Sequence, residues 1–319
     1  MRDRGRRRGD GLRSGAFPSP RHRAASRRLA RPGWWQRHAP LLPALVFAIV
    51  LTQLPFVFTL YYSVLDRNLL RPETGRFVGL ENYGKVFTDD LFRNAVFNTV
   101  KLAVSAVVLS MVLGILLAVL LDKQFFGRGV LRTLLITPFL VMPAAAALLW
   151  KTSMYNPVFG LLNWALSPFG VDGIDWVSTY PMLSIVLVLT WQWTPFMMLI
   201  LLAGLQSQSY AVVEAAKVDG ANGWATFRFV TLPHLRQFIE LGILLGSIFI
   251  VQTFDPIFMI TQGGPGQATT NLPYFIYLQA FRSFEAGEAA AAGVIVVAAT
   301  IVIATFALRV ISNLFKEEA

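Results

Sequence analysis

Residues 104–121 read VSAVVLSMVLGILLAVLL, a run without a charged side chain. A helix needs about 20 apolar residues to cross roughly 30 Å of hydrocarbon. Residues 183–205 and 294–308 are also free of charge. A buried core helix could explain one such run. However, only 14% of the chain is charged, against about a quarter in soluble domains. The sequence therefore predicts an integral membrane protein.

Apolar segments of spanning length alternate with polar interruptions along the chain. The predicted fold class is an all-α integral membrane protein with six transmembrane helices. Their expected bounds are 40–64, 96–121, 131–151, 181–205, 238–260 and 288–311. A transmembrane domain at 39–312 would then lie between an N-terminal tail at 1–38 and a C-terminal tail at 313–319.

The N-terminal tail contains twelve Arg and two Asp, and so accounts for the whole net charge of +10. We interpret residues 1–38 as a basic, disordered cytoplasmic tail, and an arm that binds nucleic acid is the alternative. With both termini inside the cell, the cytoplasmic segments carry 20 Lys and Arg and the outer segments carry 6. Basic residues concentrate on the cytoplasmic side of membrane proteins, so both termini are predicted to be cytoplasmic.

Several kinds of chemistry are absent from the sequence. The chain has no cysteine, which excludes disulfides, zinc–thiolate sites and cysteine nucleophiles. The three histidines are scattered and form no metal-binding pattern. No GxxxxGK[ST] run occurs, and the glycine-rich residues 263–266 lack its lysine and predict a turn. We therefore expect no catalytic residue, no metal and no cofactor bound by this chain.

The interruption between the fourth and fifth predicted spans, residues 210–237, reads YAVVEAAKVDGANGWATFRFVTLPHLRQ. Ala, Glu and Lys favour a helix over Tyr210–Val218, and Gly220 permits a left-handed turn after it. Asn222 can cap a second helix, Gly223–Val230, and Pro233 is expected to break the chain before the fifth span. Such a helix–turn–helix could be an interfacial amphipathic segment. Its net charge of about +1 argues against a DNA-reading unit.

The order of residues in this interruption resembles the EAA loop of binding-protein-dependent ABC importer permeases. The residues that carry the resemblance are Glu214, Ala215, Ala216, Asp219, Gly220, Ala221, Leu232 and Pro233. In that family the loop is the coupling helix, which inserts into a groove of the cytoplasmic ATPase subunit. The resemblance implies that Glu214 is the polar anchor, that the alanine pair keeps the surface small, and that Gly220 sets the turn. Val230 and Gln237 depart from the commoner Ile and Pro, which affects only local geometry.

Further motifs resemble the carbohydrate-type permeases of the maltose-permease kind, over about residues 40 to 311. They include FVGLENY at 77–83, TQGGPG at 261–266 and ATTNLP at 268–273, the last typical of sugar and polyol members. The resemblance implies the type I ABC importer permease fold in a bacterial inner membrane. It also implies a second, homologous permease subunit, two ABC ATPase subunits that bind ATP and Mg²⁺, and an extracytoplasmic solute-binding protein. Nucleic acid is not an expected partner.

Candidates for the solute pathway lie in the fourth and fifth predicted spans. They are Trp191, Gln192, Trp193, Gln252 and Asp255. The two tryptophans lie too deep for an aromatic belt, and rings beside an amide suit the C–H faces and hydroxyls of a sugar. Adjacent residues point about 100° apart, so only one tryptophan can face the pathway fully. Helix packing around a kink at Pro195 is the alternative.

The pair in the fifth span is spaced i, i+3, which puts Gln252 and Asp255 on one helix face. Asp255 could instead pair with Lys101, or either residue could join neighbouring helices. The predicted function is the permease subunit of an ABC importer for a sugar or polyol. The alternatives are a permease for an oligosaccharide or another small polar solute, and an ion-coupled secondary transporter.

Overall fold

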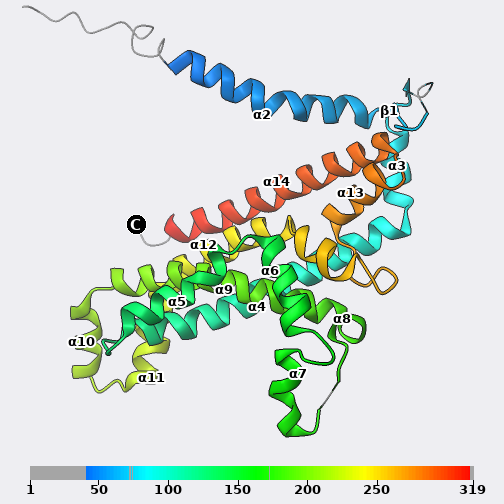
Figure 1. Cartoon of the computed structure of the whole chain (residues 1–319). Coiled ribbons are helices and arrows are strands. Elements are labelled where there is room, and N and C mark those ends of the chain that lie inside the picture. Colours follow the sequence, from blue (N-terminus) through cyan, green and yellow to red (C-terminus); the bar gives the residue numbers. More distant parts are fainter. Residues whose placement is uncertain (1–40, 72, 74, 172, 317–319) are drawn as a thin grey trace, which may run out of the picture. The chain divides into compact units, whose positions relative to one another are not determined.

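The computed structural model describes residues 41–71, 73, 75–171 and 173–316, with side chains described as far as Ile301 (Figure 1). The predicted tail at 1–38 and residues 317–319 of the predicted C-terminal tail lie outside this range. The chain divides into two units, Met1–Thr52 and Gln53–Ala319. The described part of the first unit is the apolar beginning of α2, and the second unit holds every other element.

The elements are almost all helical. In chain order they are α2 (Leu42–Ser63), β1 (Leu65–Asp66), β2 (Arg76–Phe77), α3 (Glu81–Thr88), α4 (Asp90–Asp122), α5 (Arg128–Leu140), α6 (Pro143–Leu149), the π-helical η2 (Trp150–Met154), α7 (Leu161–Leu166), the 3₁₀ turn η3 (Ser167–Phe169), α8 (Trp176–Thr179), α9 (Pro181–Ser207), α10 (Tyr210–Val218), α11 (Gly223–Thr226), the π-helical η4 (Phe227–Thr231), α12 (Leu232–Val251), the π-helical η5 (Ile257–Thr261), α13 (Leu272–Phe281) and α14 (Ala286–Lys316). The two short strands pair antiparallel, with Leu65 opposite Phe77.

Four described helical stretches are long and apolar enough to cross a membrane: α2, α4, α9 and the continuous stretch Gly223–Val251. The bent pair of α5 and α6 is a fifth if it counts as one span. The side chains described for α14 cover only Ala286–Ile301, a shorter apolar helix. The prediction of a helical, multi-pass membrane protein is confirmed, and the count of six spans stays a prediction.

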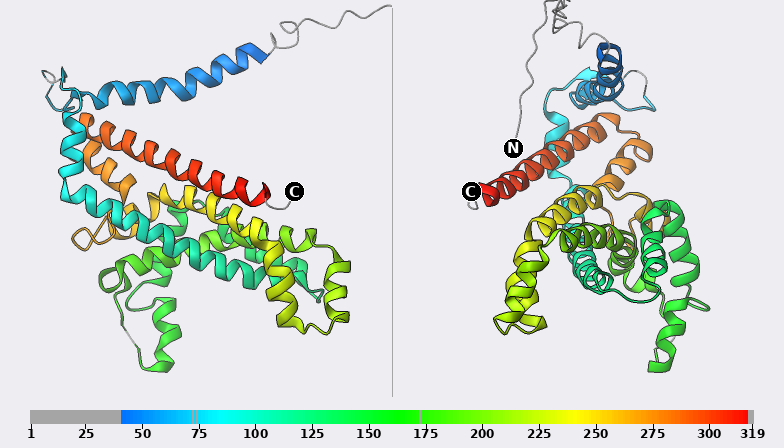
Figure 2. Two further views of the ribbon diagram at one scale, coloured as in Figure 1. Left: turned by 180° about the vertical axis from the view of Figure 1, so that it is seen from behind. Right: turned by 90° about the vertical axis from the view of Figure 1, so that its left-hand side faces the viewer.

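The core of the second unit lies between α4, α9 and α12, which pack against one another (Figures 1 and 2). Glycines bring these helices close together. A Cβ at Gly114 of α4 would lie 2.8 Å from the Cβ of Met197 on α9. Gly242 and Gly246 of α12, four residues apart, both face the end of the same methionine. Met197, which is fully buried, therefore packs against all three glycines, and Met111 of α4 also lies against Gly242.

The third predicted span, 131–151, is not one straight helix. α5 ends at Leu140, and α6 begins at Pro143 after a bend of 101°. Val141 and Met142 have extended backbone between them. The reason is Pro143, which has no backbone N–H and disfavours the helical conformation of the residue before it.

The fifth predicted span, 238–260, is interrupted as well. α12 ends at Val251, and the chain becomes helical again only at Asp255 and Pro256. Proline suits the first turn of a helix because its missing N–H would be unpaired there in any case. Gln252 and Asp255 are therefore separated by a break, and the prediction that they share one helix face is wrong.

Pro233 does not break the chain, contrary to the prediction. The helix runs without interruption from Gly223 to Val251. The π-helical turn η4 precedes the proline, and the Leu232 N–H bonds to the Phe227 carbonyl oxygen, five residues back. This wider turn lets the helix pass the position where the proline supplies no N–H.

The interruption predicted between the fifth and sixth spans contains a helix that the sequence pattern did not indicate. Asn271 precedes α13 as its N-cap, and its side chain accepts a hydrogen bond of 3.1 Å from the Tyr274 N–H. α13 packs on α14 and α4. Asn98 of α4 donates to the carbonyl oxygens of Gln267 and Thr270, which fixes the loop that leads into α13.

Candidate functional site

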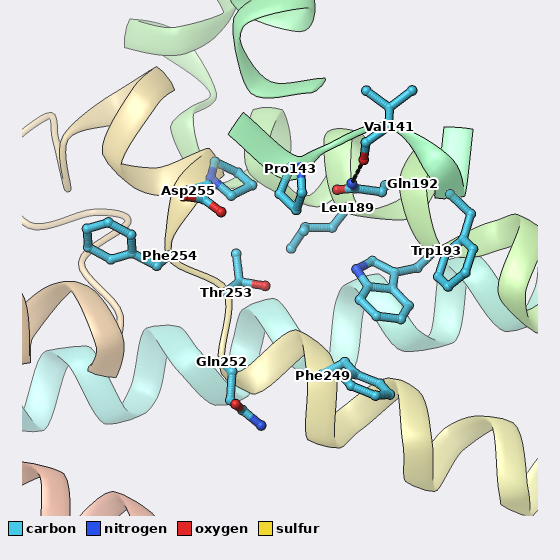
Figure 3. A pocket seen from close by; sticks show the side chains of 12 residues that line it. Val141, Pro143, Leu189, Gln192, Trp193, Phe249, Gln252, Thr253, Phe254 and Asp255 are labelled. Carbon is cyan, nitrogen blue, oxygen red and sulfur yellow. Dashed lines mark hydrogen bonds between the residues drawn. The ribbon is translucent and has the colours of Figure 1, made fainter. Parts of the chain in front are cut away.

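A cavity of about 320 Å³ lies where the two helix breaks meet the middle of α9 (Figure 3). Its lining is Phe139, Val141, Pro143, Leu189, Gln192, Trp193, Phe249, Gln252, Thr253, Phe254, Asp255 and Pro256. Four of the five predicted pathway residues are in this lining. They come from two segments that the sequence separates by about 60 residues, and their part in a solute pathway stays a prediction.

Each break exposes a backbone carbonyl that has lost its helical partner, and a side chain from elsewhere supplies a donor. Gln192 of α9 donates through Nε2 to the Val141 oxygen at 2.9 Å (Figure 3). Asn271, at the start of α13, donates through Nδ2 to the Thr253 oxygen at 2.5 Å. Irregular backbone is tolerated at membrane depth only where such groups are satisfied or line a cavity. Gln192 thus holds one wall of the cavity in place.

The two tryptophans of α9 occupy different surroundings. Trp193 lines the cavity, with its ring stacked on Phe249 at 5.4 Å between centroids. Trp191 points elsewhere and packs edge-on against Trp150 at 5.8 Å. Only one of the pair reaches the cavity, as helix geometry requires, and Trp191 belongs to the packing between α9 and η2.

Asp255 is half-buried at the far side of the break, and Figure 3 shows Gln252 and Asp255 leaving the segment at separate points. Across the described residues, Asp255 forms no ion pair with Lys101, which is exposed on α4. The predicted pairing of these two residues is therefore wrong. Lys151 of η2 also stays outside the lining, since its Nζ donates to the Met259 oxygen at 2.8 Å.

The predicted coupling segment forms a helical hairpin, α10 and α11, that projects from the bundle (Figures 1 and 2). α10 ends at Val218, and Gly220 follows in the left-handed conformation, with φ of +88°. The Ala221 N–H returns to the Ala216 oxygen at 2.9 Å. The Asn222 side chain caps α11 by accepting from the Ala225 N–H at 2.8 Å. The predicted turn and cap are confirmed.

Most of this hairpin is accessible. Glu214, Ala215 and Asp219 are exposed, whereas Ala216 and Ala221 are half-buried between the two helices. Trp224 and Phe229 are also exposed, at 71% and 72%. An accessible helix with one carboxylate, small neighbours and aromatic rings nearby can bind another protein.

The hairpin is tied to the bundle by residues that the sequence pattern did not single out. His234 Nε2 lies 3.2 Å from Ser207 Oγ and 3.1 Å from the Gly204 oxygen. A Cβ at Gly204 would lie 2.6 Å from the Phe238 ring. The end of α9 therefore holds the beginning of α12, and no local pattern reveals a contact between residues 27 positions apart.

Comparison with known proteins shows the family to which the chain belongs. Residues 110–316 match the family described as "Binding-protein-dependent transport system inner membrane component". The chain is 39% identical over 252 residues to the "Probable ABC transporter permease protein y4oQ" of Sinorhizobium fredii, covering 78% of this chain and 81% of that protein. It is 37% identical over 250 residues to the trehalose/maltose transport system permease protein MalF of Thermococcus litoralis, covering 78% and 83%.

Solved structures show the same fold. The chain superposes with a TM-score of 0.73 on a bacterial ABC transporter involved in the import of the acidic polysaccharide alginate, at 22% identity and covering 88% of this chain and 96% of that one. A second structure, of the bacterial alginate transporter with an alginate pentasaccharide-bound periplasmic protein, gives the same TM-score over 86% and 92%.

Proposed function

The chain belongs to the inner membrane components of binding-protein-dependent transport systems, and we propose that it forms the translocation pathway for a sugar or a polyol. It is a permease subunit of an ABC importer, and this family of components is not itself catalytic. The observation that carries the solute assignment is the cavity, whose lining includes the rings of Trp193 and Phe249 and the side chains of Gln192 and Gln252.

The chemistry of that lining suits polyhydroxylated solutes. Aromatic rings can pack on the C–H faces of a sugar, and amide and carboxylate groups can bond its hydroxyls. The name of the Thermococcus litoralis relative includes trehalose and maltose. Both are built from sugar units, which supports a sugar or polyol for this chain.

The assembly we propose follows from the family, which implies partner ATPases. Two ATPase subunits, which bind ATP and Mg²⁺, dock on the cytoplasmic side, and a second homologous permease subunit completes the pathway. An extracytoplasmic solute-binding protein docks on the outer side, as a periplasmic protein does in the alginate system. The chain then spans the bacterial inner membrane six times, with both termini in the cytoplasm.

Residues 210–237 are the proposed coupling segment, with Glu214 as the anchor to the ATPase. The continuity of the helix past Pro233 supports this role. Gly223–Val251 is a continuous helical stretch of 29 residues, which includes the π-helical turn η4. One end joins the exposed hairpin, and the other borders the cavity at Gln252. A rigid-body push on the hairpin would therefore move one wall of the cavity.

Uptake by the reconstituted importer tests the proposal. Proteoliposomes with both permease subunits and the ATPases, together with the binding protein, are supplied with labelled sugars and polyols of increasing chain length. We expect uptake of at least one member of the panel that requires both ATP and the binding protein. Uptake by this chain alone, driven by a proton or sodium gradient, would instead show a secondary transporter. ATP-dependent uptake of amino acids but no sugar or polyol would refute the solute assignment.

A further inference from the structure

The charged groups in the described lining of the cavity are all negative. Of the twelve residues described in its lining, Asp255 is the only one with an ionisable side chain, and no Lys, Arg or His is among them. The other polar groups are the amides of Gln192 and Gln252 and the hydroxyl of Thr253. The rest of the lining is aromatic or aliphatic.

No cation in the described chain neutralises this carboxylate. The structure shows no ion pair to Asp255 among the described residues, and its side chain is half-buried. Lys101 is exposed on α4. Lys151 lies on the neighbouring η2, where its Nζ donates to the Met259 oxygen at 2.8 Å and forms no salt bridge with Asp255. A solute in the cavity therefore meets a carboxylate that has no salt-bridge partner among the described residues.

A fixed charge next to apolar walls acts strongly on a second charge, because few water molecules screen it. An incoming phosphate, sulfonate or carboxylate would be repelled. A neutral polyol would not, and its hydroxyl groups can donate to a side-chain oxygen at this position, whether carboxylate or amide. Repulsion of the wrong solute is a common source of specificity.

We propose that Asp255 makes this cavity selective for uncharged polyhydroxylated solutes and excludes their anionic counterparts, such as sugar phosphates and uronates. This inference rests on the proposed function, since it assigns a charge to the sugar or polyol that this subunit passes. Asp255 is the residue that determines the specificity, and Gln252 and Trp193 provide contacts common to both classes of solute.

The test measures equilibrium binding to the purified complex of both permease subunits and the ATPases, without the external binding protein. Any selectivity then belongs to the membrane subunits. The probes are trehalose with trehalose 6-phosphate, and mannitol with mannitol 1-phosphate. Asp255→Asn is compared with Glu240→Gln, which removes one negative charge from α12 outside the cavity, where Glu240 pairs with Arg236 at 2.9 Å.

In the wild type, we expect the phosphate to bind at least about tenfold more weakly than the neutral member of its pair. Asp255→Asn should reduce that difference about fivefold or more and change neutral binding less than about threefold. Glu240→Gln should leave the difference unchanged.

The inference would be overturned by equal binding of both members by the wild type, by no change of their ratio in Asp255→Asn, or by no detectable neutral binding to the wild type. Loss of neutral binding in Asp255→Asn without a gain for the phosphate would also overturn it, because Asp255 would then only bond hydroxyls. Failure of the proposed function is a different result, since it appears in the uptake assay of the wild type.

Discussion

Replacement of Gly220 by valine isolates one backbone conformation in the proposed coupling segment. Gly220 has φ of +88°, and a Cβ built there meets no atom within 4 Å. The cost of a side chain is therefore conformational and not steric crowding by neighbours. For a residue other than glycine, the left-handed conformation costs about 1–2 kcal/mol, and a β-branched side chain lies at the upper end. That energy lowers the population of the native turn by a factor of about 5–30.

A graded series and a matched control separate conformation from size. Asparagine tolerates the left-handed conformation better than alanine does, and valine tolerates it least. We therefore expect uptake to fall in the order Gly220→Asn, Gly220→Ala, Gly220→Val. A Cβ at Gly223, three residues later, would also meet no atom within 4 Å, but the φ of Gly223 is not positive. Gly223→Val adds the same side chain without the left-handed strain, so it should retain most of its uptake.

The assay has two measurements on each variant. Quantitative immunoblotting of membranes gives the amount of inserted chain, which should be unchanged because Gly220 is exposed and outside the spans. ATP-dependent uptake and solute-stimulated ATP hydrolysis give the coupling, and both should decrease about fivefold or more in Gly220→Val. Wild-type uptake in Gly220→Val, or an equal loss in Gly223→Val, would refute the reasoning that the left-handed turn transmits the ATPase movement.

Three further variants test other contacts. Glu214→Lys reverses the charge of an exposed side chain, so it should abolish uptake but leave membrane insertion intact; uptake at the wild-type rate would contradict its role as the ATPase anchor. Gln192→Leu removes the donor to the carbonyl at the α5–α6 break, which should cost about 1–3 kcal/mol and lower the melting temperature of the purified complex. Gln252→Leu, whose amide donates only within its own helix and is exposed, is its control, and equal losses would argue against the break as the cause. Gly114→Ala places a Cβ 2.8 Å from a buried neighbour and should cost about 1–3 kcal/mol in the same melt, whereas Gly129→Ala, with no atom within 4 Å, should be neutral or stabilising.

The features that the sequence predicted correctly depend on interactions close along the chain. The low fraction of charged residues, 14%, indicates a membrane protein. The hairpin of α10 and α11 follows from two residues. Gly220 suits a positive φ, and Asn222 caps α11 by accepting a hydrogen bond from the N–H three residues ahead. Glycine and asparagine do the same in most surroundings, so the pattern alone is sufficient.

The effects of two prolines differ from what the sequence predicted. Pro143 coincides with a bend of 101°, whereas the helix continues through Pro233 because a π-helical turn precedes it. Either outcome accommodates a residue that has no backbone N–H. Whether a proline bends the helix or the helix continues through it depends on how the neighbouring helices pack, which the local sequence does not show.

The cavity itself was decided only by the tertiary structure. In the sequence, residues 131–151 and 238–260 look like continuous apolar spans. A break in the helix is a change of backbone conformation, and it leaves the apolar pattern of the side chains unaltered. What makes each break tolerable is a donor from a distant position: Gln192 reaches Val141 across 51 residues, and Asn271 reaches Thr253 across 18. An unpaired carbonyl in the membrane is costly. The breaks therefore exist only because the fold brings an amide to each of them, and the sequence alone could name the amides but not the carbonyls they serve.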